Sequence, residues 1–184
     1  EGLPVYSIND DEFKIPISYE MVNERMGATD EVSEIFNPET NLYEEVTYTR
    51  EVRVEEVKQI MVKEVWFFDR NYSRMDVRII GLCPIREYVD ENGEVVRRQT
   101  FWINYPEARN LLARYEVFNA GNDAQRRSFD DIFIKRYFGS YIVQEANMYD
   151  NRSIESYAVG VDARLESERI KNEIFNFEHD LWEF

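Results

Sequence analysis

A chain of 184 residues with 43 % hydrophobic residues can bury a core of its own, which excludes a disordered polymer although 32 % of the residues are charged. The net charge of −15 repels phosphates and anionic headgroups, so neither nucleic acid nor a lipid surface is an expected partner. The lone cysteine, Cys83, excludes an intrachain disulfide, and no apolar run approaches the roughly 20 residues that a transmembrane helix needs.

The N-terminal quarter carries most of the acidity and little hydrophobic periodicity. Residues 1–49 hold 12 acidic residues against two basic ones. The segment "FKIPISYEM" alternates apolar side chains around Pro16, which is typical of a short edge strand. The polar stretch after it is broken by glycine and proline. We therefore predict an extended acidic arm over residues 1–46, followed by a core domain over residues 47–184.

Alternating β-branched and aromatic residues then predict strands. A helix is an alternative for residues 50–62, but the two alternating runs in "WFFDRNYSRMDVRIIGLCPI" favour a hairpin. Asn92 and Gly93 supply a strong hairpin turn before the next run, "VVRRQTFWINY". Strands over about 47–105 should thus form an antiparallel meander. Four of its bulky side chains are expected in the core: Trp66, Phe68, Phe101 and Ile103.

Helical signals follow from Pro106, which suits a first helical turn. Ser128 and Asp131 have the spacing of a capping box, and Gly139 can end that helix. The segment "YIVQEANMYD" is expected to continue helically, and a last helix should start at about Asp162. Apolar residues spaced four, three and four apart form the predicted packing face of this helix: Ile170, Ile174, Phe177 and Leu181.

Strands over about 47–105 followed by helices over about 106–184 predict an α+β fold. We expect a small antiparallel β-meander packed against C-terminal α-helices, with the extended acidic arm in front of it. Within the last helix, Arg169 and Glu173 can pair across one turn.

Candidates for catalysis have simpler structural interpretations. The neighbours of His179 point about 100° away from each other on a helix, and a histidine near a helix C-terminus is a favourable partial cation. Asp130 and Asp131 lie in a first helical turn, where the dipole stabilises negative charge. Cys83 precedes Pro84 at the end of an apolar strand, where it acts as a small hydrophobe.

The chain has no metal-binding, nucleophile-elbow or phosphate-loop motif, so we predict no catalytic residue, no metal and no cofactor. A small carboxylate-based hydrolase remains an alternative, and it requires Asp130, Asp131 and His179 in one pocket.

Contacts with other proteins are the remaining function. Arginine outnumbers lysine 17 to 5, and aromatic residues reach 15 %, as suits such contacts. The terminal "FEHDLWEF" either packs on the domain, which the preceding amphipathic helix favours, or docks on a neighbour. For Arg126 and Arg127 a solvated loop is favoured over a docking site. The partner-binding candidates from the tail, this loop and the arm are Phe177, Trp182, Phe184, Arg126, Arg127, Tyr43, Glu44 and Glu45.

Several long segments carry a family resemblance. They are "EVWFFDRNYSRMDVRIIGLCPI", "FWINYPEARNLLARYEVFNAGNDAQRRSFDDIFIKRYFGSYIVQEANMYDN" and "IKNEIFNFEHDLWEF", with a fainter likeness in "YSINDDEFKIPIS". The chain resembles the GldN/PorN family of gliding-motility and type IX secretion proteins of Bacteroidetes.

The resemblance implies a non-enzymatic structural protein of the periplasm, with no cofactor and no direct membrane insertion. Its expected partners are the outer-membrane lipoprotein GldK/PorK, with which it would form a ring at the inner face of the outer membrane, and the periplasmic domain of GldM/PorM. Self-association in the ring is expected as well. Members have an N-terminal signal and a further N-terminal segment, so we expect this chain to be a trimmed core. A periplasmic glycan or peptidoglycan binder that uses exposed Trp and Tyr is the alternative.

Overall fold

The computed structural model describes residues 2–181 except residues 11, 29, 38–41, 50, 91, 119–125 and 150, and over residues 30–49 it describes the backbone alone. The chain forms two compact units. The first unit comprises Glu1–Val65 and Ile79–Arg114, and the second comprises Trp66–Arg78 and Tyr115–Phe184. Among the described residues, no helix is both long and apolar enough to cross a membrane.

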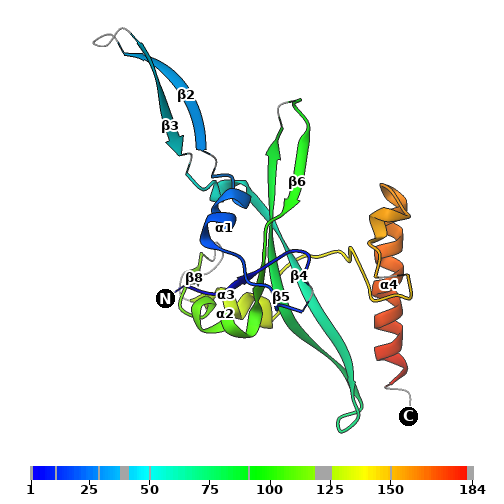
Figure 1. Ribbon diagram of the computed structural model, residues 1–184. Helices are drawn as coiled ribbons and strands as arrows, with labels where there is room; N and C mark the ends of the chain where they lie inside the picture. The colour runs from blue at the N-terminus through cyan, green and yellow to red at the C-terminus, as the bar shows by residue number, and fades with distance from the viewer. Residues whose placement is uncertain are drawn as a thin grey trace. The chain divides into compact units, whose positions relative to one another are not determined.

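The described elements are antiparallel strands and α-helices, which confirms the predicted α+β class (Figure 1). The strands are β1 Val5–Tyr6, β2 Asp30–Asn37, β3 Leu42–Thr49, β4 Val57–Asp69, β5 Arg74–Val89, β6 Val95–Gln99, β7 Trp102–Asn104, β8 Glu116–Val117 and β9 Arg127–Ser128. The α-helices are α1 Tyr19–Arg25, α2 Tyr105–Leu112, α3 Phe129–Ile134 and α4 Val161–Asp180, with 3-10 turns η1 Val54–Glu56 and η2 Ile154–Ser156.

The main sheet is built around the long strand β5. Its order is β1-β7-β5-β4, and β6 pairs with the remaining part of β5. The expected turn at Asn92 and Gly93 is present: Gly93 has φ +82°, and the Asp90 N–H donates to the Glu94 carbonyl over 2.9 Å. The meander of β4, β5 and β6 is therefore confirmed. The strand favoured over a helix for residues 50–62 begins only at Val57, because Val54–Glu56 forms the 3-10 turn η1.

The predicted third strand is split in two at Thr100. The Thr100 N–H and Oγ1–H both donate to the Pro84 carbonyl, over 3.1 and 2.8 Å, and Thr100 is fully buried. These bonds to the neighbouring strand draw the chain inward between β6 and β7. Hydrophobic periodicity along the sequence does not show that Thr100 is buried and separates the two strands.

The N-terminal residues are not confirmed as an extended arm. β1 pairs with β7 in the main sheet, so that Val5 lies opposite Ile103. Pro16 forms only an isolated bridge with Tyr6, and the predicted edge strand gives way to α1, because the Ser18 Oγ accepts the Met21 N–H over 3.4 Å as an N-cap. β2 and β3 then form an antiparallel hairpin of their own.

The core of the first unit gathers around Trp102, which is only 5 % exposed. Its indole meets the Phe13 ring edge to face, with centroids 6.2 Å apart, and Phe13 meets Tyr6 in the same way at 5.7 Å. Gly81 makes room for this stack, because a Cβ there would lie 2.6 Å from the Phe13 ring. Met26, Leu82, Cys83, Phe101, Tyr105 and Ala108 are also buried.

The core prediction holds for Phe101 but is wrong for two aromatic residues of β4. Trp66 is 38 % exposed and Phe68 is 42 % exposed, whereas Phe101 is buried and Ile103 is half-buried. The reason is topological. From Arg74 to Ile80, β5 pairs with β4 alone among the described strands, and a two-stranded ribbon has no further strand to cover both of its faces.

Helix α3 has the predicted capping box but ends early. Arg136 adopts φ +53°, the left-handed conformation that ends a helix, and the Tyr137 N–H donates to the Ile132 carbonyl over 2.9 Å. The helix therefore stops at Ile134, well before the predicted terminator Gly139. The segment "YIVQEANMYD" is not helical where described, and it forms an isolated bridge between Gln144 and Ser153.

Helix α4 begins at Val161 with Gly160 at the N-cap position, slightly before the predicted start at Asp162. It packs through Ile170, which is buried, and Ser167, whose Oγ accepts the Ile142 N–H over 2.7 Å. The 3-10 turn η2 supplies Ile154, which is 2 % exposed, and Arg169 forms the predicted ion pair with Glu173. The predicted packing of a C-terminal helix thus rests on few buried side chains.

The burial of Cys83 predicts that its thiol reacts slowly in the folded protein. Cys83 is completely buried, and this burial raises the pKa of its thiol to about 11. Because the thiolate is the reactive form, alkylation of the native protein at pH 8 should be at least about 100-fold slower than that of the urea-unfolded chain. The measurement is the iodoacetamide labelling rate by mass spectrometry. A native rate equal to the unfolded one would contradict the buried position.

Candidate docking surfaces

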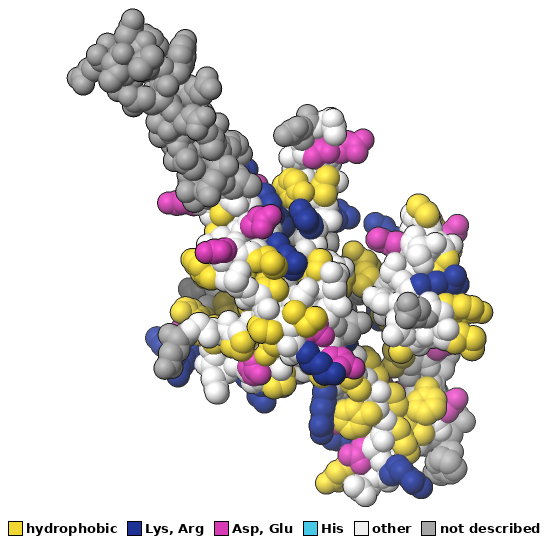
Figure 2. Space-filling model, in the orientation of Figure 1, with side chains coloured by type: hydrophobic (Ala, Val, Ile, Leu, Met, Phe, Trp, Pro, Cys, Tyr) yellow, Lys and Arg dark blue, Asp and Glu magenta, His cyan; other side chains and the backbone are white. Residues whose placement is uncertain are grey.

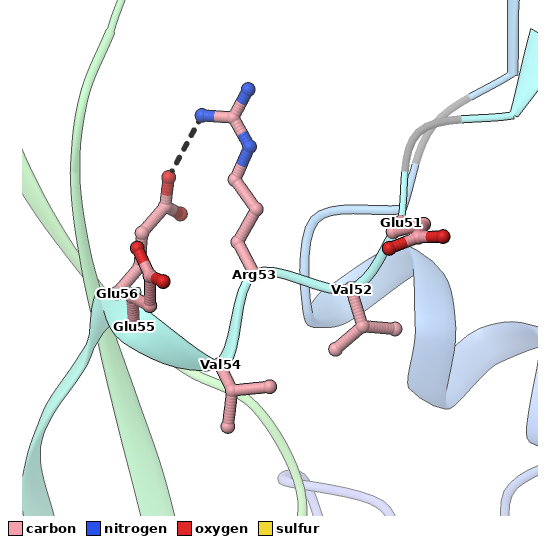
Figure 3. Close-up of a pocket in the computed structure, with 6 residues that line it drawn as sticks. All are labelled: Glu51, Val52, Arg53, Val54, Glu55 and Glu56. Carbon is pink, nitrogen blue, oxygen red and sulfur yellow. Dashed lines mark hydrogen bonds and ion pairs between the residues drawn. The ribbon is translucent and has the colours of Figure 1, made fainter.

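Six consecutive residues, from Glu51 to Glu56, line an open hollow (Figure 3). They join β3 to β4, and Figure 3 shows Arg53 turned toward Glu56. The Arg53 Nη1 donates to Glu56 over 3.0 Å, and the Arg86 Nε of β5 donates to the same carboxylate over 2.5 Å. All the lining residues come from one segment, so the hollow does not bring distant elements together.

The electrostatics of Glu56 indicate an ion pair of the fold. Its partial burial opposes ionisation, but the hydrogen bonds from Arg53 and Arg86 outweigh it, so the pKa of Glu56 lies below its ordinary value. A general acid needs a pKa raised toward neutrality, which is the opposite shift. Gly27, at φ +93°, lies against Arg86, since a Cβ there would approach the guanidinium within 2.5 Å. The cluster therefore ties the end of α1 to η1 and β5.

The residues of the hydrolase alternative have separate partners. The Asp131 carboxylate accepts the Ser128 N–H over 3.1 Å and the Ser128 hydroxyl over 2.9 Å, and it pairs with Lys135 over 3.1 Å. His179 stacks on Phe175, with ring centroids 6.2 Å apart. Among the residues that the structure describes, no three His, Cys, Asp or Glu side chains are arranged to hold a metal ion. The role of Asp131 is that of a helix cap.

This cap predicts an acid-sensitive contribution to stability. Hydrogen bonds from the Ser128 backbone and hydroxyl, and then Lys135, lower the pKa of Asp131 to about 2. Its stabilisation is complete above about pH 4, the pKa in the unfolded chain, and is lost as the pH falls toward 2. Asp131→Asn should therefore destabilise the protein at pH 7 but less at pH 2.5, by urea unfolding. An equal effect at both pH values would contradict the cap.

The structure reaches only part of the predicted partner-binding set. Phe177 is 52 % exposed on the last turns of α4. Arg126 is exposed and lies 3.4 Å from Glu116. Arg127 belongs to β9 rather than to a solvated loop, and its guanidinium lies over the Tyr137 ring at 4.9 Å. Trp182, Phe184 and the side chains of Tyr43, Glu44 and Glu45 lie outside the described residues, so the set as a whole stays a prediction.

Exposed apolar side chains are frequent on the second unit. Figure 2 shows hydrophobic side chains at the surface of much of the molecule. Large apolar side chains that gather at an exposed surface are typical of interaction sites. The exposed side chains of the second unit include Phe118, Met148, Tyr149, Val159, Val161, Leu165, Phe175 and Phe177.

A second exposed cluster lies at the turn between β4 and β5. We name Trp66, Phe68, Arg70, Tyr72, Arg74 and Arg78 the tip surface; all six are exposed. The Arg74 guanidinium lies 5.3 Å from the Tyr72 ring centroid, and Arg78 lies 4.9 Å from that of Phe67. Sequence reasoning assigned Trp66 and Phe68 to the core. The mixture of arginine with aromatic residues in "WFFDRNYSR" was the signal that could have identified this surface.

Comparison with known families decides the relationship. The family model described as "Gliding motility associated protein GldN" matches residues 1–183. The chain belongs to the GldN family. The predicted resemblance is confirmed, and it extends over the N-terminal residues where the likeness was faint. Membership in the GldN family indicates a component of gliding motility or type IX secretion. No curated protein matches the chain.

Proposed function

We propose that the chain is a non-enzymatic structural component of the type IX secretion and gliding machinery. In this proposal it lies in the periplasm at the inner face of the outer membrane and assembles with the lipoprotein GldK/PorK into a ring. The ring would contact the periplasmic domain of GldM/PorM, and copies of this chain would contact one another within it.

Two features support an assembly function. The chain belongs to the GldN family, and its second unit leaves many large apolar side chains exposed. Burying such side chains against a partner is favourable by about 25 cal/mol per Å² of apolar surface. The exposed apolar surface of the second unit is the observation that carries the proposal, because it gives the chain a driving force for association that needs no reaction.

The test is the mass of the complex with the lipoprotein. Purified chain and purified lipid-free GldK/PorK, mixed at micromolar concentration, should elute together with a mass above the sum of one copy of each, by light scattering. Phe177→Ala should weaken this complex if the end of α4 contributes to it, and Tyr19→Ala, at an exposed aromatic position of the first unit, is the control. Failure of the unmodified chain to bind the lipoprotein would overturn the proposal.

The glycan-binding alternative has one supporting observation, the exposed rings of Tyr149 and Tyr157. Sugars stack on open aromatic faces, but here Arg152 lies 4.7 and 4.5 Å from the two ring centroids. One face of each ring is thus already occupied by a guanidinium, which favours a protein contact. Co-sedimentation with peptidoglycan sacculi distinguishes the two functions: retention that Tyr149→Ala abolishes would favour the glycan binder.

A further inference from the structure

The tip surface has a chemistry opposite to that of the chain as a whole. In a protein of net charge −15, its three arginines are accompanied locally by Asp69 and Asp76 alone among the described residues 66–78. Tyr72 is 72 % exposed, and within the turn the Asp69 carboxylate accepts the Asn71 N–H over 2.9 Å. Arginine, tryptophan and tyrosine are the residue types that dominate binding energy at protein interfaces.

Neither face of this ribbon is covered by another strand of the described sheet. β4 is an edge strand, and β6 and β7 pair with β5 only from Gly81 onward. The fold therefore presents apolar and cationic side chains together on one two-stranded element. A partner that fits this surface must offer carboxylates next to an apolar group.

Helix α4 carries such a combination on its last turns. Glu173, Phe177 and Asp180 are spaced four and three residues apart, so they share one face, which we name the acidic helix face. All three side chains are exposed. The stripe lies on the C-terminal side of Ile170, the buried residue of the α4 packing face. An aromatic ring between two carboxylates complements an aromatic ring between arginines.

We propose that the tip surface of one copy docks on the acidic helix face of a second copy. The contact joins two different surfaces, so each copy can bind one neighbour through its tip and another through α4. Such a heterologous contact produces a ring or a filament rather than a closed dimer. The inference deepens the self-association in the proposed function, on which it rests, by naming the two surfaces and the partner chemistry.

Charge reversal in matched pairs tests the contact. The tip variant carries Arg70→Glu and Arg74→Glu, and the helix variant carries Glu173→Arg and Asp180→Arg. Each places like charges opposite each other, so the Kd of self-association, by sedimentation velocity near 150 mM salt, should rise about 100-fold. An equimolar mixture of the two variants should associate again, because every contact in it then pairs opposite charges. The control is Arg98→Glu with Arg114→Glu, which changes the net charge on the first unit by the same amount as the tip variant and should leave the Kd unchanged.

The outcomes separate this inference from the proposed function. A monomeric wild-type chain at all concentrations, or a tip variant that associates normally, overturns the docking contact. Loss in both variants without recovery in the mixture also overturns it, because the two surfaces then do not face each other in the contact. Binding to GldK/PorK is measured separately, so the assembly proposal can survive any of these results. Circular dichroism melting curves establish that each variant is folded, and Arg70→Gln with Arg74→Gln replaces a tip variant that is not.

Discussion

Replacing Trp102 by alanine should lower the free energy of unfolding by about 4 kcal/mol, the largest single effect that we expect in this protein. The indole is 5 % exposed, packs on the Phe13 ring and belongs to β7, which joins β1 to β5. Removing it leaves a cavity at the point where Gly81 lets the aromatic stack approach the backbone. The loss combines the transfer of a large apolar side chain to water with the cavity that remains.

The measurement is chemical unfolding followed by circular dichroism, with a surface aromatic residue as the control. Tyr19→Ala, at an exposed position of α1 in the same unit, should change the free energy of unfolding by less than about 0.5 kcal/mol. A Trp102→Ala variant as stable as Tyr19→Ala would show that the aromatic stack is not the core of the first unit.

Replacing Ile154 by alanine should have the largest effect in the second unit, with a loss of about 3 kcal/mol. Ile154 is 2 % exposed, and its N–H donates to the Val143 carbonyl over 2.9 Å. The second unit buries few other side chains among its described residues, so α4 has few other contacts that hold it in place. Removing this one should allow α4 to detach from η2.

Hydrogen exchange of the α4 amides measures this detachment directly. Amides of α4 should lose protection in Ile154→Ala, while amides of β5 and β7 keep theirs, since the first unit has a core of its own. Val159→Ala removes an exposed aliphatic side chain close by and is the matched control. A uniform loss of protection across both units would instead mean that they unfold together.

Local chemistry determined much of the secondary structure. Alternation of apolar residues predicted β4 and β5, the turn at Gly93 predicted β6, and the capping residues of α3 were correct down to the hydrogen bonds of Ser128. These signals succeed because each depends on residues within one turn or one strand. The family resemblance likewise rested on the sequence alone, and the family match confirmed it.

Signals that depend on distant partners were the ones that failed. The edge strand around Pro16 is reduced to an isolated bridge with Tyr6, because α1 begins directly after its N-cap Ser18. The segment "YIVQEANMYD" forms an isolated bridge with Ser153 in place of its predicted helix, since helix propensity is weak evidence that tertiary contacts override. Burial of Trp66 and Phe68 was wrongly predicted for a related reason: hydrophobic periodicity shows that a strand has an apolar face, but not whether another layer covers it.

The candidate docking surfaces likewise depend partly on the sequence and partly on the tertiary structure. Composition, charge and motif content by themselves determined that this chain carries no recognisable catalytic signature and is rich in the arginine and aromatic residues of interfaces. Only the tertiary structure decided which of these residues are buried, as Trp102 is, and which remain exposed, as Tyr72 and Phe177 are. The physical reason is that burial depends on which strand or helix lies next to a residue in space, and the register and order of the strands, β1-β7-β5-β4, are properties of the assembled sheet.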